Sequence, residues 1–276
     1  MGRSVKSLAL LILAGLVMLP GCSKLQARDE LNKGVHAFKV GAFEKSVEHF
    51  KRATELDPDF INARLYLATA YAAQFFQAPS EENRKKAEAA IVEYQKVLEI
   101  DRSNATALAY IAQLYFGMAG TVAATSSKWN EAHDLFLKSK EYRQRLIEVE
   151  PQNPEHYYSV GVIDWTLTYR PRMQLRSDLK LPKSETPIPP KNRRELADQN
   201  APLVEEGITV LTRAIDINPK YLDAIAYLQL MYREKADLAE TPRDRDALLE
   251  QADEWYERYE QVRQEMQKAP APAPSS

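Results

Sequence analysis

Apolar side chains recur at helical spacing along almost the whole chain beyond residue 28, and this pattern predicts a protein built from amphipathic helices. The pattern is clearest near its start, where two apolar stripes are separated by Gly41. The first stripe consists of Leu31, Val35 and Phe38, and the second consists of Val47, Phe50, Ala53 and Leu56. Two short helices joined by a glycine turn form a helical hairpin. We therefore expect an all-α fold with a hairpin as its first unit.

Four similar short phrases end successive apolar stretches. They are Glu55-Leu-Asp-Pro58, Glu99-Ile-Asp-Arg102, Glu148-Val-Glu-Pro151 and Asp216-Ile-Asn-Pro219. Proline cannot continue a helix because it lacks the backbone N–H and clashes with the preceding turn. The acid or amide before it favours a turn. A helix-ending phrase used four times predicts a chain built by repetition.

The first repeated unit resembles the tetratricopeptide repeat, a helix–turn–helix unit of about 34 residues. The resemblance rests on the residues Gly34, Gly41, Ala42, Phe43, Ser46, Phe50, Ala53 and Pro58. In that family a small residue lets the two helices cross closely, an aromatic packs at the turn, and a proline ends the second helix. The resemblance implies a tetratricopeptide-like α-solenoid over residues 29–266, made of about five helical hairpins. The units fall at about 29–60, 61–104, 105–153, 154–220 and 221–266.

The spacing of the helix ends shows that the later units are longer than the first. Successive ends are 44 (57 to 101), 49 (101 to 150) and 68 (150 to 218) residues apart, against about 34 for a standard unit. We expect the surplus as insertions between the two helices of units 2–5, on one rim of the solenoid. The segments assigned to it are 77–81, 117–127, 170–192 and 237–243. Insertions on one face of a solenoid often mark its binding side, although loops also accept extra residues at little cost.

The longest insertion, residues 170–194, is strongly basic in a chain that is otherwise acidic. Eight basic residues against Asp178 and Glu185 give it a charge of +6 (eight minus two). The basic residues are Arg170, Arg172, Arg176, Lys180, Lys183, Lys191, Arg193 and Arg194. Its prolines are expected to keep it from forming a further repeat, with Pro187-Ile-Pro-Pro190 as a short polyproline-like stretch. Two interpretations stay open: a basic arm for anionic lipid headgroups or an acidic partner, and a solvated loop over the neighbouring helices.

Residues 1–21 are predicted to be a signal peptide. Arg3 and Lys6 precede an uncharged apolar stretch at 8–18, which is about half the length needed to span a bilayer as a helix. Cys22 follows and is the only cysteine, so no internal disulfide is possible. The arrangement resembles the bacterial lipoprotein signal, which implies a lipid on Cys22 and a lipid-anchored linker at 22–28. Ser23 after the cysteine is similar to the pattern of lipoproteins sorted to the outer membrane, facing the periplasm; an ordinary secretory signal, with a secreted or periplasmic product, is the alternative.

The charge of the chain argues against nucleic acid as a partner. The net charge is −2, and it becomes −4 without residues 1–21 (35 basic minus 39 acidic). Binding to phosphate backbones needs a net basic surface. The last residues, 267–276, include an alternation of Ala and Pro at 269–274 and are expected to form a disordered tail.

No residue pattern points to catalysis or metal binding. The four histidines have no helical zinc spacing, and there is no phosphate-binding or dinucleotide-binding glycine loop. Asp164 beside Trp165 suggests an alternative, a degenerate enzyme or small-ligand site, because a buried acid with a shifted pKa can be catalytic. More often such an acid is structural, bonded here to a hydroxyl such as that of Tyr157 or Tyr169. We expect no enzyme activity, no cofactor and no metal site.

In the tetratricopeptide family, the first helix of each unit lines an inner groove. Aligning the units predicts ten residues towards it: Phe38, Lys39, Asn62, Thr69, Gln113, Phe116, Tyr158, Trp165, Arg233 and Glu234. For each residue, packing in the core or on a solvated face is the alternative. Leu31 and Val35 occupy positions where repeats that bind the acidic tails of heat-shock chaperones need Lys and Asn, so binding of that type is not expected.

The expected function is therefore that of a non-catalytic protein–protein interaction scaffold of the bacterial cell envelope. It would bind a partner protein in the groove or on the inserted rim, through aromatic anchors and polar contacts. The alternative is a peripheral membrane module that binds anionic lipid through residues 170–194. Neither nucleic acid nor a small-molecule substrate is expected as a partner.

Overall fold

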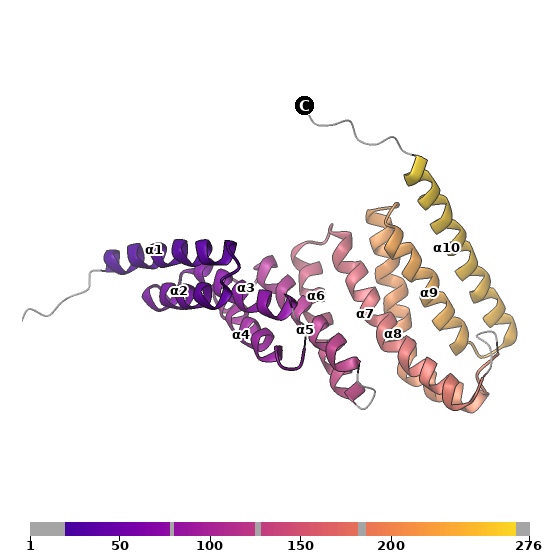
Figure 1. Cartoon of the computed structure of the whole chain (residues 1–276). Coiled ribbons are helices and arrows are strands. Elements are labelled where there is room, and N and C mark those ends of the chain that lie inside the picture. The colour runs from indigo at the N-terminus through magenta and orange to yellow at the C-terminus, as the bar shows by residue number, and fades with distance from the viewer. Residues whose placement is uncertain (1–19, 78–79, 125–127, 182–185, 269–276) are drawn as a thin grey trace, which may run out of the picture.

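The computed structural model describes residues 20–77, 80–124, 128–181 and 186–268, and in these ranges the chain forms ten α-helices and no strand. The helices are α1 (Pro20–Lys39), α2 (Phe43–Leu56), α3 (Ile61–Gln77), α4 (Arg84–Ile100), α5 (Ala105–Ala123), α6 (Trp129–Val149), α7 (Pro154–Asp178), α8 (Pro190–Ile217), α9 (Leu222–Leu238) and α10 (Pro242–Lys268). They pair in chain order as five hairpins that stack side by side into an elongated array (Figure 1). The prediction of an all-α solenoid of about five hairpins is confirmed.

The helix-ending phrases mark the boundaries between hairpins, as predicted. The helices α2, α4, α6 and α8 end at Leu56, Ile100, Val149 and Ile217, each within the apolar part of its phrase. The residue after each end no longer has helical dihedral angles, and its N–H still bonds the carbonyl four residues earlier. Asn104 and Asn153 then cap the next helices by accepting hydrogen bonds from the N–H groups of Ala107 and Glu155.

The helices form two layers along the array. Among the odd-numbered helices, the backbones of α1 and α3, of α3 and α5, and of α7 and α9 pack closely, whereas the even-numbered helices of the described chain are linked to one another through side chains, as where Arg84 of α4 pairs with Glu131 of α6. The series has one wider gap, because the backbones of α5 and α7 do not pack closely; they are joined through α6 and by the side chain of Arg170, which donates to the Ala123 carbonyl. The odd-numbered layer is the one expected to line the groove, and it opens between α5 and α7.

The surplus residues of units 3–5 mostly lengthen helices instead of forming loops. Helix α2 has 14 residues, whereas α6, α7, α8 and α10 have 21, 25, 28 and 27. Much of the expected insertions at 117–127 and 170–192 lies inside α5, α7 and α8. A helix satisfies its own backbone hydrogen bonds and can pack along its whole length, which a long loop cannot.

Helix α7 continues through Pro171, although proline was expected to end a helix there. The residues beyond it include Arg176, which is buried and ion-paired with α9, so tertiary contacts hold this end of the helix in place. Pro189 has polyproline-like angles (φ −54°, ψ 144°) and Pro190 opens α8. The predicted polyproline-like stretch is therefore confined to the residues before the helix.

Residues 22–28 are helical, whereas the sequence suggested a linker. Helix α1 begins at Pro20, and Ala27 is fully buried. No proline or glycine stands between Cys22 and Gly34, so nothing in the sequence interrupts the helix there. The predicted signal peptide (apart from Pro20 and Gly21), Lys183 and the final residues 269–276 lie outside the described residues.

The core runs through the stack as three clusters. The first joins α1–α3 around Phe50, the second joins α3–α7 around Tyr94 and Leu108, and the third joins α7–α10 around Leu228 and Met231. Each cluster takes side chains from more than one hairpin, as expected for units that cannot bury their apolar faces alone. Within the described chain, α5 is the one helix long and apolar enough to cross a membrane, and its packing against α6 in the second cluster accounts for that apolar character.

We predict that Gly161→Ala destabilises the protein by about 1–3 kcal/mol, because α7 and α8 cross closely at this position. An added Cβ would lie 2.5 Å from Leu211 Cγ. The matched control is Gly120→Ala in α5, where no atom lies within 4 Å of the added Cβ. The control should be neutral or stabilise by up to about 1 kcal/mol. Urea denaturation of both variants measures the difference, and equal effects would contradict the close crossing.

Candidate functional site

A cavity of about 350 Å³ lies between α7, α9 and α10. Three helix faces line it, each defined by residues at helical spacing. They are Trp165, Tyr169 and Arg172 of α7, Leu230, Arg233, Glu234 and Asp237 of α9, and Arg245, Leu249 and Asp253 of α10. We call it the C-terminal pocket. Its lining combines aromatic and aliphatic walls with charged groups of both signs, a composition typical of ligand sites.

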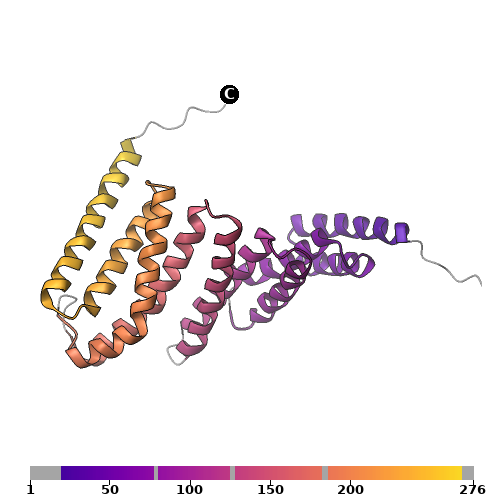
Figure 2. The same ribbon diagram turned by 180° about the vertical axis from the view of Figure 1, so that it is seen from behind.

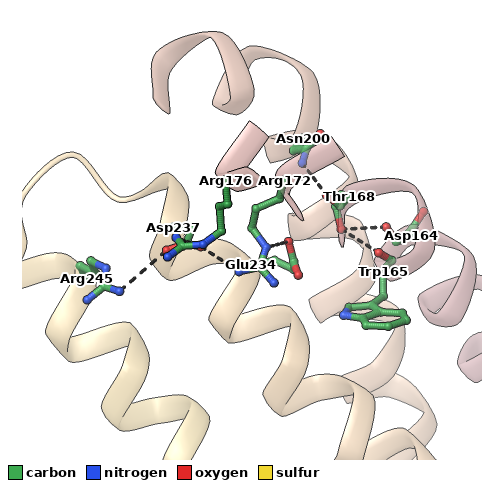
Figure 3. Close-up of polar contacts among 9 residues, drawn as sticks. All are labelled: Asp164, Trp165, Thr168, Arg172, Arg176, Asn200, Glu234, Asp237 and Arg245. Atoms are coloured by element: carbon green, nitrogen blue, oxygen red, sulfur yellow. Dashed lines mark hydrogen bonds and ion pairs between the residues drawn. The ribbon is translucent and has the colours of Figure 1, made fainter. Parts of the chain in front are cut away.

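Three of the ten predicted groove residues meet in this pocket: Trp165, Arg233 and Glu234. The indole of Trp165 stacks on Tyr169, with ring centroids 4.6 Å apart, and its edge-to-face partner is Tyr227 at 5.3 Å. Its Nε1–H is buried and has no hydrogen-bond partner among the described residues. Figure 3 shows the nitrogen-bearing edge of the ring turned towards α9.

A network of buried ion pairs forms the floor of the pocket (Figure 3). Arg172 Nη1 donates to Asp237 Oδ2 at 2.8 Å, and Arg176 Nη1 donates to the same oxygen at 3.2 Å. Arg245 lies 3.8 Å from the other Asp237 oxygen, so α7 and α10 are both attached to α9 through this carboxylate. Removing one member of such a buried group leaves an uncompensated charge and is strongly destabilising.

Glu234 is the less satisfied acid of the pocket. Its Oε2 lies 2.8 Å from Arg172 Nε, within ion-pair distance but without hydrogen-bond geometry, and Oε1 has no partner in the described chain. Burial raises the pKa of Glu234 to about 7, against the opposing effect of Arg172. Near neutral pH this side chain is therefore able to exist both as a carboxylate and as a carboxylic acid.

A second buried charge group lies on α7 outside the pocket. Asp164 is fully buried, and its Oδ1 accepts a hydrogen bond from Lys140 Nζ of α6 at 2.5 Å. Lys140 also donates to Glu206 of α8 at 2.8 Å, so the group joins three helices. Burial raises the pKa of Asp164 to about 7. Asp164 was correctly expected to be buried, but its partner is a lysine and not the hydroxyl of Tyr157 or Tyr169.

The other predicted groove residues do not form one site. Phe38 packs in the N-terminal cluster against Phe43, and Thr69 is hydrogen-bonded to Tyr94, so both belong to the packing of the array. Lys39, Asn62 and Gln113 are exposed on α1, α3 and α5. Phe116 and Tyr158 line a second, smaller cavity between α5, α6 and α7.

The basic residues of 170–194 do not form one exposed arm. Several of them are used inside the fold: Arg172 and Arg176 in the pocket floor, Arg170 on the Ala123 carbonyl and over the Trp129 ring, and Arg193 on the Glu240 carbonyl. Lys180, Lys191 and Arg194 are exposed. The interpretation as a solvated loop is also wrong for 170–178 and 190–194, which are helical.

Sequence reasoning missed Lys140, Arg143, Asp237 and Arg245. Helical spacing in the sequence indicated part of this arrangement. Arg172 and Arg176 are four residues apart, as on one helix face, and Arg143 falls at helical spacing from the buried Ser139 and Leu146. Pro171 obscured the first signal because it suggested that no helix continued there. Among the described residues, no group of three or more His, Cys, Asp or Glu side chains is placed to hold a metal ion.

Comparison with known proteins identifies the fold. No family model matches the sequence, and no curated protein matches it. Among solved structures, that of the MamA protein is similar, with a TM-score of 0.55 and 14% identity over 90% of this chain and 98% of that one. Residues 41 to the end of MamA from Desulfovibrio magneticus RS-1 give 0.53 and 13% over 88% and 98%. YrrB, described as a TPR protein with an unusual peptide-binding site, gives 0.47 and 14% over 86% of both chains.

At these identities the similarity concerns the fold alone. Together with the five stacked hairpins, the similarity to MamA confirms the predicted α-solenoid fold.

We predict that Glu234 makes the stability of the protein fall as the pH rises from about 4.5 to about 7. The folded protein holds the Glu234 proton more tightly than the unfolded chain, because the pKa is about 7 in the fold and 4.5 ordinarily. This contribution is fully present below pH 4.5 and is lost as the pH rises through 7. Its slope is at most about 1.4 kcal/mol per pH unit.

The measurement is the melting temperature of the wild type and of Glu234→Gln across this pH range. The wild type should lose stability relative to the variant as the pH rises. Glu257→Gln, at an exposed position of α10, removes one carboxylate and should show no such trend. A wild-type-to-Glu234→Gln difference that stays constant with pH would contradict the assignment.

Proposed function

We propose that the protein is a non-catalytic scaffold that binds an extended segment of a partner protein along its odd-numbered helices. The C-terminal pocket would be the main attachment. The observation that carries this proposal is that two buried polar atoms on its lining residues lack partners in the described chain: the N–H of Trp165 and Oε1 of Glu234.

An amide group matches this pair. A partner carbonyl would accept from the Trp165 N–H, and a partner N–H would donate to Glu234, once the side chains that shield these two buried atoms move aside. An extended peptide offers such groups at every residue. Buried polar atoms without partners are costly, so satisfying both would favour the bound state.

The aromatic side chains near the pocket supply the apolar contribution. Tyr227 of α9 contacts both Tyr158 and Trp165 of α7, and the ring centroids of Tyr158 and Tyr227 are 5.7 Å apart. Rigid aromatic side chains lose little entropy on binding and are frequent anchors at interfaces. The arrangement suits a protein segment better than a small molecule.

We place the protein in the bacterial cell envelope, anchored by a lipid on Cys22 to the outer membrane and facing the periplasm. Cys22 is exposed at the start of α1, at the opposite end of the array from α10 (Figure 2). An anchor there would hold the C-terminal pocket away from the membrane, accessible to a periplasmic partner. The secreted or periplasmic form without lipid is the alternative.

Anionic-lipid binding through residues 170–194 is the weaker proposal. Arg172 and Arg176 are buried in ion pairs with Asp237, so they are not available to headgroups without breaking the pocket floor. Among the described residues of this segment, the exposed basic side chains that remain are Lys180, Lys191 and Arg194. At roughly 1 kcal/mol each near an anionic surface, they give weak adsorption.

The binding proposal is tested by photo-crosslinking in intact cells. A crosslinking phenylalanine analogue at Tyr169, which is 37% exposed and lines the pocket, should capture a defined partner. The same analogue at Val92, which is 49% exposed on α4, controls for contact with the even-numbered layer. Adding Trp165→Phe, which keeps a ring but removes the N–H, should weaken capture about fivefold. Equal capture at Val92, or no effect of Trp165→Phe, would count against this pocket.

The anchor is tested separately. Cys22→Ser should move the protein from the membrane fraction to the soluble fraction and abolish metabolic labelling with a fatty acid, because the thiol that carries the lipid is gone. Ser23→Ala, which leaves the cysteine in place, should keep both. Membrane retention of unlabelled Cys22→Ser would refute the lipid anchor.

A further inference from the structure

Arg143 of α6 lies in the smaller cavity, of about 210 Å³, where the odd-numbered layer opens between α5 and α7. Phe116 of α5 and Tyr158, Ser159, Val162 and Ile163 of α7 complete its lining. We call it the Arg143 pocket. Its walls are mainly apolar and aromatic, and Tyr158 and Ser159 add hydroxyl groups to the lining.

The guanidinium of Arg143 has neither a hydrogen bond nor an ion pair within the described chain. The other three basic residues in this half of α6 have partners. Lys140 pairs with two carboxylates, Arg145 donates to the Arg102 carbonyl, and Lys138 lies over the Tyr115 ring. Arg143 is therefore the one basic residue of this stretch that has no partner among the described residues.

Glu155 at the start of α7 is the acid whose charge raises the pKa of Arg143, but Glu155 does not neutralise the guanidinium. Its carboxylate forms no ion pair with Arg143 and accepts a hydrogen bond from the Tyr221 hydroxyl instead. Partial burial lowers the pKa of Arg143, as expected for a cation that has lost some of its water without gaining a counter-charge beside it. Guanidinium stays protonated in proteins, so the positive charge remains in the pocket.

A cation that is partly buried and unpaired has lost some of its hydration without a compensating partner, and an acid is the usual match for it. A guanidinium binds a carboxylate through two parallel hydrogen bonds, which is its strongest common pairing. The apolar walls formed by Phe116, Val162 and Ile163 would cover the stem of the group that brings the carboxylate.

We propose that the Arg143 pocket binds the carboxylate of a glutamate or aspartate side chain within the partner segment, next to an apolar residue. This inference rests on the proposed scaffold function and names the chemistry of its partner. The pocket is joined to the C-terminal pocket by the aromatic contacts from Tyr158 through Tyr227 to Trp165, so one segment in the odd-numbered layer would reach both.

The test uses two blocked tripeptides that differ in one group, acetyl-Leu-Glu-Leu-amide and acetyl-Leu-Gln-Leu-amide. Neither has a free terminus, so the glutamate side chain is the only carboxylate. Titration of arginine-labelled full-length protein is followed by the side-chain Nε–H signals. The glutamate peptide should shift the Arg143 signal in a saturable way and bind roughly tenfold or more tightly than the glutamine peptide.

Two variants assign the effect to this residue. Arg143→Met keeps a long side chain without the charge and should abolish the difference between the two peptides. Arg145→Met, two residues along the same helix, should leave it intact. Arg143→Met should also melt at the same temperature as the wild type or higher, because it removes a partly buried charge that has no ion-pair partner.

The inference is overturned if the two peptides shift the Arg143 signal equally, or if neither shifts it. A melting temperature several degrees lower in Arg143→Met would overturn it too, because it would assign Arg143 a structural partner. Crosslinking at Tyr169 that depends on Trp165 would persist in that case, leaving the scaffold proposal standing. If instead that crosslinking is lost while Arg143 still discriminates between the two peptides, the proposal for the C-terminal pocket fails and the carboxylate site at Arg143 stands.

Discussion

Helix α7 buries charged side chains at several positions, and the C-terminal half of the solenoid is arranged around matching them. Asp164 is matched by Lys140 of α6, which also reaches Glu206 of α8. Beyond Pro171, Arg172 and Arg176 are matched by Asp237 of α9. A regular hairpin stack is held by apolar contacts alone. Here, charge matching adds a requirement on which helices are neighbours and in what register, since any shift would leave a buried charge unpaired.

This requirement also accounts for the long helices. The extra turns of α7 beyond Pro171 carry Arg172 and Arg176 to α9, and Arg193 on the first turn of α8 bonds the Glu240 carbonyl just before α10. The surplus residues therefore connect unit 4 to unit 5. They look like an insertion in the sequence because they interrupt the repeat, and they act as an interface in the fold.

The sequence was informative where structure depends on local chemistry. Pro58, Pro151 and Pro219 end hairpins because proline cannot continue a helix without a compensating contact. Pro171 shows the limit of the same argument, because ion pairs with a helix about 65 residues away hold the chain in place there. Local propensity is a weak guide wherever long-range contacts supply the missing free energy.

The candidate site was predictable to a similar extent. Trp165, Arg233 and Glu234 were expected in the groove from repeat alignment, and they line one pocket. Alignment does not show which basic residue finds an acid, because that depends on pairs distant in sequence. Asp237 meets three arginines, from α7 and α10, whereas Arg143 meets none of the described acids.

Asp237 and Arg143 represent two kinds of charge: one is paired within the fold, and the other is left for a partner to pair with. In the pocket floor, every ion pair joins two helices of the chain, and the charges are used up in folding. At Arg143 the backbones of α5 and α7 lie apart, and the protein retains a partly buried cation that forms no ion pair with any acid of the described chain. A fold tolerates such a cost at few positions, since a few kcal/mol is a large part of the total stability. In an open pocket among aromatic side chains, a partner that brings a carboxylate would form the ion pair that folding does not provide, and the free energy of that ion pair would contribute to binding.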